Sequence, residues 1–176
     1  MKKTVIILFA LFFLLSGASI GVDKKTVEDA GAQALAGKAP DLAMIDSDGR
    51  ATGMRDLRGN AVILHFWASW CSPCKREFPA IERIYQRFKD SGLTVLAVSI
   101  EYGADLTEMK RLASSLGATF PVFAVKHGNG VERYWSLGVP MTYFIDKNGN
   151  IAGRFAGEGK WTSAGVEKLI KTMVEE

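Results

Sequence analysis

Two kinds of apolar pattern alternate along this chain. Almost continuous apolar runs at residues 61–67 and 93–100 are typical of strands that are buried on both faces of a sheet. At residues 72–90 and 105–116, apolar positions recur every three or four residues, which is the spacing of amphipathic helices. Strands that alternate with helices are joined by crossover connections and run parallel, so this part of the chain predicts a β-α-β-α unit.

Antiparallel strands are predicted on either side of this unit. Apolar runs at 42–45 and 51–54 flank an Asp-Ser-Asp-Gly turn, and runs at 141–145 and 151–155 flank Asp-Lys-Asn-Gly-Asn, so each pair predicts a hairpin. The other expected elements are a helical turn, a short strand, a short helical or irregular segment and a closing helix, at residues 55–59, 121–125, 131–137 and 163–174. The predicted fold class is α/β, with a central mixed β-sheet, helices on both faces, an N-terminal β-hairpin and an inserted αβ element.

The first 22 residues differ from the rest of the chain. Two lysines precede a continuous apolar run, and small residues follow it. This arrangement predicts that residues 1–22 are a signal peptide, cleaved after Ala18, or an N-terminal membrane anchor. The anchor remains an alternative because residues 4–22 carry no charge and, at ~1.5 Å per residue, nearly span a hydrocarbon core of ~30 Å. Both interpretations place the rest of the chain outside the cytoplasm, in a periplasm or at the outer face of the membrane.

Residues 23–38 show no strong apolar face. They are polar and contain several Ala and Gly residues, which predicts a linker or a loose helix between the targeting segment and the folded domain. The chain is therefore expected to contain one domain, over residues 39–176.

The charge of the chain excludes one class of partner. The formal net charge is +3, and removal of the two lysines near the N-terminus leaves +1. A domain that is so nearly neutral has no electrostatic footprint for nucleic acid. We also expect no bound cofactor.

The chain contains only two cysteines, Cys71 and Cys74. Structural disulfides usually link distant segments, where they constrain the unfolded chain most, and a bridge across three residues does little of this. A four-ligand zinc site needs more Cys and His than two cysteines and two histidines supply. The spacing therefore favours reversible thiol–disulfide chemistry without a metal.

The position of the two cysteines suggests separate roles. Cys71 falls at or just before the start of a predicted helix, where free backbone N–H groups and the helix dipole favour a thiolate. Cys71 is thus the expected nucleophile, and Cys74, one turn further on, is expected to resolve the mixed disulfide. Pro73 suits the first turn of a helix because its missing N–H would be unpaired there.

The segment at residues 66–79 resembles the active-site segment of the thioredoxin superfamily. Its closest likeness is to the TlpA/ResA-like branch of exported thiol–disulfide oxidoreductases. Residues 37–41, 56–60 and 138–146 resemble further motifs of that branch, and the likeness extends over residues 37–174. The resemblance implies a thioredoxin-like fold and a protein-disulfide oxidoreductase.

Three residues take roles from the resemblance, of which Pro79 has a structural one, because it matches the proline that kinks the active-site helix in thioredoxins. Pro140 matches the cis-proline of the fold, whose loop faces the two cysteines and leaves backbone groups of Val139 free to pair with substrate. Glu77 matches the acidic residue that the branch places three positions after the second cysteine. A partly buried carboxylate there would have a raised pKa and could exchange a proton with Cys74. The alternative for Glu77 is a solvated side chain near the helix N-terminus.

The neighbours of the two cysteines include one expected contact and two departures from the family pattern. Trp70 directly precedes Cys71 and is expected to flank the site, where it would contact substrate. His65 stands six residues before Cys71, where it would relay protons beneath the site or, alternatively, pair with a backbone carbonyl in the core. Met141 follows the proline, where the family usually has Thr, and would make the substrate groove more apolar.

The resemblance also implies partners. Proline before the second cysteine, with no histidine there, is similar to the reducing members of the superfamily. A reductase outside the cytoplasm would draw electrons from a membrane-embedded thiol donor. It would act on oxidised protein substrates such as apocytochrome c or proteins of copper-site assembly. The alternatives are a disulfide oxidase or isomerase and a non-catalytic metal chaperone or binding module. A thiol peroxidase fits less well, because the chain lacks the Thr-then-Cys arrangement of peroxiredoxins.

Overall fold

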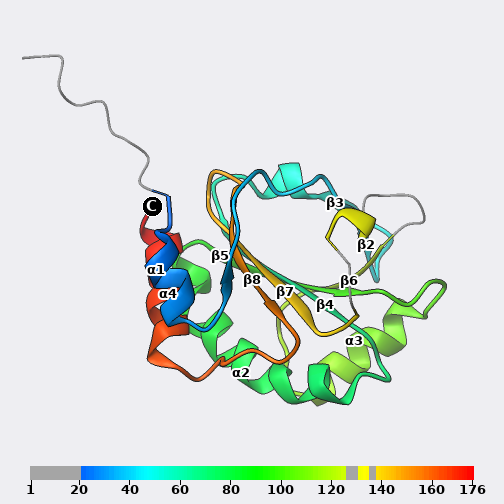
Figure 1. Ribbon diagram of the computed structural model, residues 1–176. Coiled ribbons are helices and arrows are strands. Elements are labelled where there is room, and N and C mark those ends of the chain that lie inside the picture. The colour runs from blue at the N-terminus through cyan, green and yellow to red at the C-terminus, as the bar shows by residue number, and fades with distance from the viewer. Residues whose placement is uncertain (1–20, 126–130, 135–137) are drawn as a thin grey trace, which may run out of the picture.

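One mixed sheet organises the computed structural model, which describes residues 21–125, 131–134 and 138–176 (Figure 1). Its strands are β1 (Gln33–Ala34), β2 (Ala43–Asp46), β3 (Ala51–Gly53), β4 (Ala61–Trp67), β5 (Leu93–Ser99), β6 (Val122–Val125), β7 (Met141–Ile145) and β8 (Ile151–Ala156). They lie in the order β1-β8-β7-β4-β5-β6-β2-β3. β4, β5 and β6 run parallel, whereas β2 with β3 and β7 with β8 form antiparallel hairpins, so the predicted mixed sheet is confirmed.

Three of the four α-helices in the described residues follow the predicted helical segments closely. The α-helices are α1 (Lys24–Asp29), α2 (Ser72–Phe88), α3 (Leu106–Ser115) and α4 (Ala164–Glu175), and the 3₁₀ turns are η1 (Met54–Leu57), η2 (Lys89–Ser91) and η3 (Val131–Arg133). Ser163 caps α4, and its side chain accepts a hydrogen bond from the amide of Val166. The α3–β6 segment is the inserted αβ element.

β4 lies at the centre of the sheet, and all of its residues are buried. Because side chains alternate along a strand, Ile63 and Trp67 belong to the hydrophobic cluster on one face, and Leu64 and Phe66 to the cluster on the other. The same alternation places His65 on the face of Ile63 and Trp67. His65 is thereby held inside the core, and it lies shortly before the two cysteines in the sequence.

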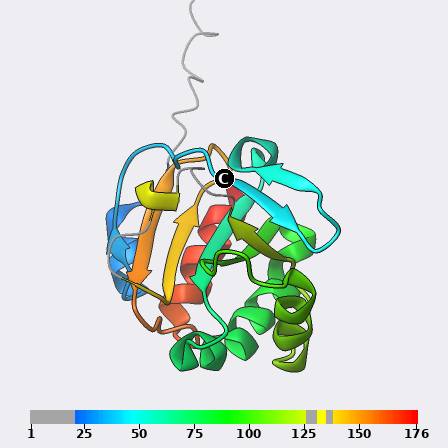
Figure 2. The same cartoon turned by 90° about the vertical axis from the view of Figure 1, so that its right-hand side faces the viewer.

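The two faces of the sheet are covered differently. Buried residues of α1, α2, α3 and α4 all belong to the cluster that contains Ile63 and Trp67. The opposite cluster is completed instead by Leu42, Met54, Val131 and Tyr134, from loops and 3₁₀ turns. Figure 2 shows α4 behind the strands and η3 in front of them. Both faces are therefore covered, one by α-helices and the other by the 3₁₀ helices η1 and η3 together with loop segments.

The predicted linker at residues 23–38 is part of the folded domain. Within it, α1 packs against α4 (Figure 1), and β1 pairs antiparallel with β8. Val27 and Ala30 are fully buried although the segment is mostly polar. The contact is close enough that a Cβ on Gly165 would lie 2.2 Å from the Asp29 carbonyl oxygen. This segment was mistaken for a linker because a six-residue helix with two small buried side chains leaves almost no apolar pattern.

Some sequence predictions concern residues outside the described part of the chain. Residues 1–20, which contain most of the predicted signal peptide or anchor, are among them, as are 126–130 and 135–137 with His127 and Trp135. Among the helices of the described ranges, none has the length and apolar character needed to cross a bilayer.

Candidate functional site

Cys71 and Cys74 form a disulfide at the start of α2. Their sulfur atoms are 1.99 Å apart, and their Cα atoms are 5.3 Å apart. Cys71 is the N-cap of the helix, and its Sγ accepts a hydrogen bond from the backbone N–H of Cys74 at 3.2 Å. In the reduced protein, this amide and the positive end of the helix dipole would stabilise negative charge on Cys71 Sγ. The geometry therefore suits Cys71 as the attacking thiolate.

α2 presents to the core an apolar stripe together with the Cys74 sulfur and the Glu77 carboxyl group. Its buried positions follow helical spacing at Cys74, Glu77, Phe78, Ile81, Ile84 and Phe88. Pro79 lies inside the helix, as the resemblance implies. Cys74 and Glu77 share a face because they are three residues apart, so the helix itself brings the resolving cysteine and the acid to the same side.

The loop before Cys71 is held by Glu101, which lies just after β5. The Glu101 carboxylate accepts hydrogen bonds from the backbone N–H of Ser69 at 2.6 Å and from the Ser69 hydroxyl at 2.9 Å. The next residue, Trp70, is 66% exposed. Sequence reasoning expected Trp70 at the site but missed Glu101, which no motif marks and which lies 32 residues away.

The loop before β7 contains a cis peptide bond between Val139 and Pro140. Val139 is partly buried and packs against the cluster that contains both cysteines. Met141 is 1% exposed and packs in the opposite cluster, where it pairs with Phe66 across the sheet. The expectation that Met141 lines the substrate groove is therefore wrong, because β7 turns its first side chain to the other face.

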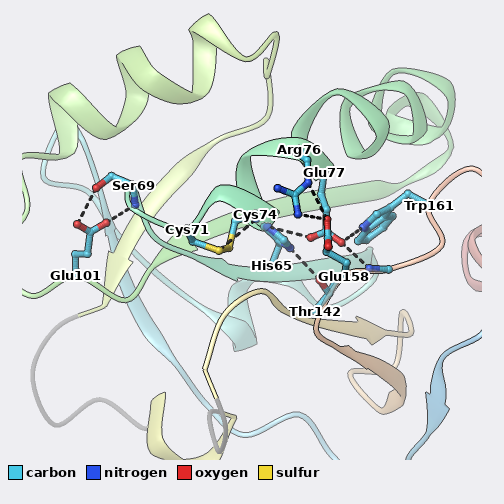
Figure 3. Close-up of a disulfide and its surroundings, with 11 residues drawn as sticks. His65, Ser69, Cys71, Cys74, Arg76, Glu77, Glu101, Thr142, Glu158 and Trp161 are labelled. Carbon is cyan, nitrogen blue, oxygen red and sulfur yellow. Dashed lines mark hydrogen bonds and ion pairs between the residues drawn. A yellow bond between two sulfur atoms is a disulfide. The ribbon is translucent and has the colours of Figure 1, made fainter.

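The Glu77 carboxylate is buried beneath the start of α2. It is 5% exposed, and its Oε1 accepts hydrogen bonds from the Gly159 amide at 2.6 Å and from Trp161 Nε1 at 2.8 Å (Figure 3). Burial raises the pKa of Glu77 to about 7, although both hydrogen bonds act in the opposite direction. A proton acceptor with a pKa near neutrality thus lies on the same helix face as Cys74.

His65 is fully buried between its own strand, β4, and helix α2. Its Nδ1 lies 2.9 Å from the Thr142 hydroxyl oxygen, and its Nε2 lies 3.9 Å from Oε2 of Glu77. Burial lowers the pKa of His65 to about 3, so the ring is neutral at ordinary pH. In the view of Figure 3, the ring lies between the disulfide and the Glu77 carboxylate. The partner of Nδ1 is a side-chain hydroxyl rather than the backbone carbonyl considered from the sequence.

Several residues of this network carry no sequence signal. Trp161, Gly159 and Thr142 lie more than 60 positions from the cysteines along the chain and reach the site only because β7, β8 and the following loop pack beside α2. At the surface, Arg76 of α2 forms an ion pair with Glu158 at 2.9 Å, so its positive charge is paired. A search by motif would recover none of these contacts.

Metal-binding side chains do not gather at this site. Over the ranges that the structure describes, His, Cys, Asp and Glu residues form no group of three or more that could hold a metal ion.

Comparison with known proteins places this geometry among thiol–disulfide proteins. A family model described as the AhpC/TSA family matches residues 35–154. A protein of Geobacillus thermodenitrificans named thiol-disulfide oxidoreductase ResA is 32% identical over 141 residues, which cover 80% of each chain.

Two solved structures share the fold. One, from Chlorobium tepidum and described as a thiol:disulfide interchange protein DsbE, has a TM-score of 0.69 and 28% identity and covers 81% of this chain and 99% of its own. The other, a thiol:disulfide interchange protein from Bacteroides sp., has a TM-score of 0.68 and 25% identity and covers 79% of this chain and 91% of its own.

Proposed function

This chain belongs to the AhpC/TSA family and is a thiol–disulfide oxidoreductase, and from that premise we propose that it is a protein-disulfide reductase acting outside the cytoplasm. One observation carries the proposal. The Cys71 sulfur caps α2 and accepts an amide hydrogen bond, while Cys74 is fully buried behind it. An attacking sulfur and a resolving sulfur are thereby distinguished by position.

The reaction takes two exchange steps. The Cys71 thiolate attacks one sulfur of a substrate disulfide, forms a mixed disulfide and releases the other sulfur as a thiolate. Cys74 then loses its proton and attacks the Cys71 sulfur, which releases the second substrate sulfur. The substrate gains two electrons and two protons, and the protein is left with the Cys71–Cys74 disulfide that the structure contains.

In this proposal Glu77 accepts the Cys74 proton. A general base works best when its pKa lies near the working pH, and the pKa of Glu77 is raised to about 7 by burial. The carboxylate is supported for this role because the amide of Gly159 and the indole of Trp161 both donate to Oε1. Those two donors leave Oε2 as the oxygen that takes up the proton.

Trp70 and the loop of Val139 and Pro140 form the substrate contact in this proposal. The exposed indole of Trp70 stands next to the attacking sulfur and offers apolar contact to a polypeptide. Backbone groups of Val139 would pair with an extended substrate segment in the manner of an added strand. A protein substrate fits this arrangement, because the contacts are a flat indole and backbone groups rather than an enclosed cavity.

The direction of transfer and the partners are finer parts of the same proposal. The residue directly before Cys74 is Pro73 rather than a histidine, and this favours a reducing centre. The electrons would come from a membrane-embedded thiol donor. The recipients would be apocytochrome c, whose CxxCH must be reduced before haem attachment, or proteins of copper-site assembly. Relatives named thiol-disulfide oxidoreductase ResA and thiol:disulfide interchange protein DsbE support the exchange chemistry on which these finer parts rest.

Trapping with Cys74→Ser tests the exchange steps. The variant keeps the attacking sulfur but cannot resolve, so substrates should accumulate as mixed disulfides on Cys71 that dithiothreitol releases. Cys71→Ser is the matched control, because it keeps the buried sulfur and should trap nothing. Trapping by Cys71→Ser but not by Cys74→Ser would contradict the assigned order of attack.

The reduction potential of the Cys71–Cys74 pair tests the direction. A value near about −270 mV, that of thioredoxin, supports a reductase, whereas a value near about −120 mV is that of a strong oxidant. The second result would replace the proposal with a disulfide oxidase.

A further inference from the structure

Two buried polar atoms face one another without a hydrogen bond. His65 Nε2 and Glu77 Oε2 are 3.9 Å apart, and both belong to the few buried side-chain atoms of the described residues that lack a partner. Buried polar groups in proteins are nearly always hydrogen-bonded, so such a pair needs an explanation. An approach of about 1 Å would bring the two atoms to hydrogen-bond distance.

The contacts of Glu77 identify which oxygen holds its proton. Oε1 already accepts two N–H donors, from Gly159 and Trp161, and a hydrogen on that oxygen would face them. Oε2 is free of such donors and points toward the imidazole. When Glu77 is protonated, the O–H is therefore at Oε2 and is directed at His65 Nε2, which must then be the unprotonated nitrogen.

The other side of the ring accommodates either tautomer. Nδ1 of His65 lies 2.9 Å from the Thr142 hydroxyl, and a hydroxyl can donate or accept a hydrogen bond. The pairing is rigid, because His65 on β4 and Thr142 on β7 are direct partners across the sheet. The rings of Phe78 and Trp161 enclose the imidazole edge-on. The ring is thus held in place while its proton remains free to change nitrogen.

We propose that Thr142, His65 and Glu77 form a buried relay in which the single ring proton of neutral His65 moves between Nδ1 and Nε2 as Glu77 gains or loses its own proton. With Glu77 protonated, its Oε2–H donates to Nε2, and Nδ1–H donates to Thr142. With Glu77 ionised, Nε2–H donates to Oε2, and the Thr142 hydroxyl turns to donate to Nδ1. One proton leaves the trio in total, and the ring keeps one throughout.

The relay makes His65 a positioning residue for Glu77. His65 donates a third hydrogen bond to the Glu77 carboxylate only when that group is ionised. The ionised carboxylate is also the state that must receive a proton from Cys74. In this respect the inference rests on the proposed function. The charged groups that act on Glu77 from outside the trio are Arg76 and Glu158, which favour opposite protonation states and pair with each other. The oxidised cysteines carry no charge.

The tautomer of His65 can be read directly by long-range ¹H–¹⁵N NMR. The experiment uses the full-length, oxidised chain in detergent micelles with ¹⁵N-labelled histidine, and His127→Gln assigns the spectrum because the chain has two histidines. We expect the ring proton to move from Nδ1 to Nε2 as the pH rises, with a midpoint near 7. One tautomer at every pH, or a doubly protonated ring, would overturn the relay. No disulfide substrate is present, so this outcome is separate from failure of the trapping experiment.

Three variants test the parts of the relay. Glu77→Gln cannot titrate, so one tautomer should persist at every pH, and an unchanged transition there would overturn the coupling. Thr142→Ala removes the hydroxyl and should move the midpoint by about 0.5–1 pH unit, the equivalent of one hydrogen bond. Thr142→Ser keeps the hydroxyl and should restore the original midpoint. An equal midpoint in all Thr142 variants would exclude Thr142 from the relay.

Discussion

Trp161 donates a hydrogen bond from Nε1 to Oε1 of Glu77 at 2.8 Å, although 84 residues separate the two in the chain. The indole is buried and packs against Phe144 and Phe155, so its N–H is fixed in direction. A residue of the loop before α4 therefore controls the acidity of a carboxyl group on α2. This contact explains why Glu77 can be buried and still ionise near neutral pH.

Removing only the indole N–H should raise the pKa of Glu77 further. Trp161→Phe keeps an aromatic ring but takes away one donor to the carboxylate. A hydrogen bond to a charged group contributes about 1.5–3 kcal/mol, so the pKa should rise by about 1–2 units above the wild-type value near 7. Titration of the ¹³C-labelled Glu77 carboxyl by NMR measures the shift.

The exposed Trp70 supplies the control for this substitution. Its side chain is two-thirds exposed and makes no contact with Glu77, so Trp70→Phe should leave the pKa of Glu77 unchanged. If Trp161→Phe also leaves it unchanged, the indole contributes no stabilisation of the carboxylate.

His65 and Glu77 should contribute opposite pH dependences to stability. The folded pKa of Glu77, about 7, is above its unfolded value of 4.5, so its contribution to stability falls as the pH rises between these values. The folded pKa of His65, about 3, is below its unfolded value of 6.5, so its contribution rises with pH between those values. Over the shared window from pH 4.5 to 6.5, the two contributions should nearly cancel.

Single substitutions should reveal the two slopes. Relative to wild type, Glu77→Gln should gain stability as the pH rises from 4.5 to 6.5, and His65→Asn should lose it. In each variant, the free energy of unfolding should change by about 1.4 kcal/mol per pH unit relative to wild type, which corresponds to one proton. Urea unfolding at the two pH values measures the difference. Parallel curves for wild type and both variants would show that neither group titrates abnormally.

Spacing in the sequence predicted the site only where its residues are neighbours on one element, and the family resemblance added the cis peptide bond before Pro140. Cys71, Cys74 and Glu77 lie on the start of one helix, so their spacing alone puts them on one side of it. Thr142 enters from β7 and Trp161 from the loop after β8, and their contacts depend on how those segments pack. No local pattern records such packing.

For the fold as well, local patterns were predictable and contacts between distant segments were not. Long apolar or amphipathic segments such as β4 and α2 were recognised because many residues share one periodicity. The place of α1 in the folded domain was missed because its stability comes from a close contact with α4 rather than from its own pattern. Met141 was misplaced for a related reason, because the face that a strand's first residue occupies depends on the turn that precedes it.

The contact between α1 and α4 should be sensitive to one methyl group. Gly165→Ala would place a Cβ 2.2 Å from the backbone carbonyl of Asp29, which cannot move without displacing α1. Alanine in a helix is favoured over glycine by about 1 kcal/mol, so a net loss of stability would show that the clash dominates. We expect a loss of about 1–3 kcal/mol in urea unfolding. Gly21→Ala, which meets nothing within 4 Å, is the control, and equal effects of both would contradict the close packing.

The carboxylate of Glu101 should set how well the Trp70 loop is presented to a protein disulfide. Its two hydrogen bonds to Ser69 hold the loop immediately before the attacking sulfur. Glu101→Gln keeps the size of the side chain but loses the charge-assisted bonds, at a cost of about 1–2 kcal/mol. The rate of insulin disulfide reduction should therefore fall about 5- to 30-fold, while the small substrate dithionitrobenzoate, which needs little contact beyond Cys71, is reduced nearly as before.

Glu108→Gln on α3 is the control, because it removes an equal charge away from the loop and should leave both rates unchanged. Equal losses on both substrates would instead place the effect of Glu101 on the reactivity of the cysteine itself.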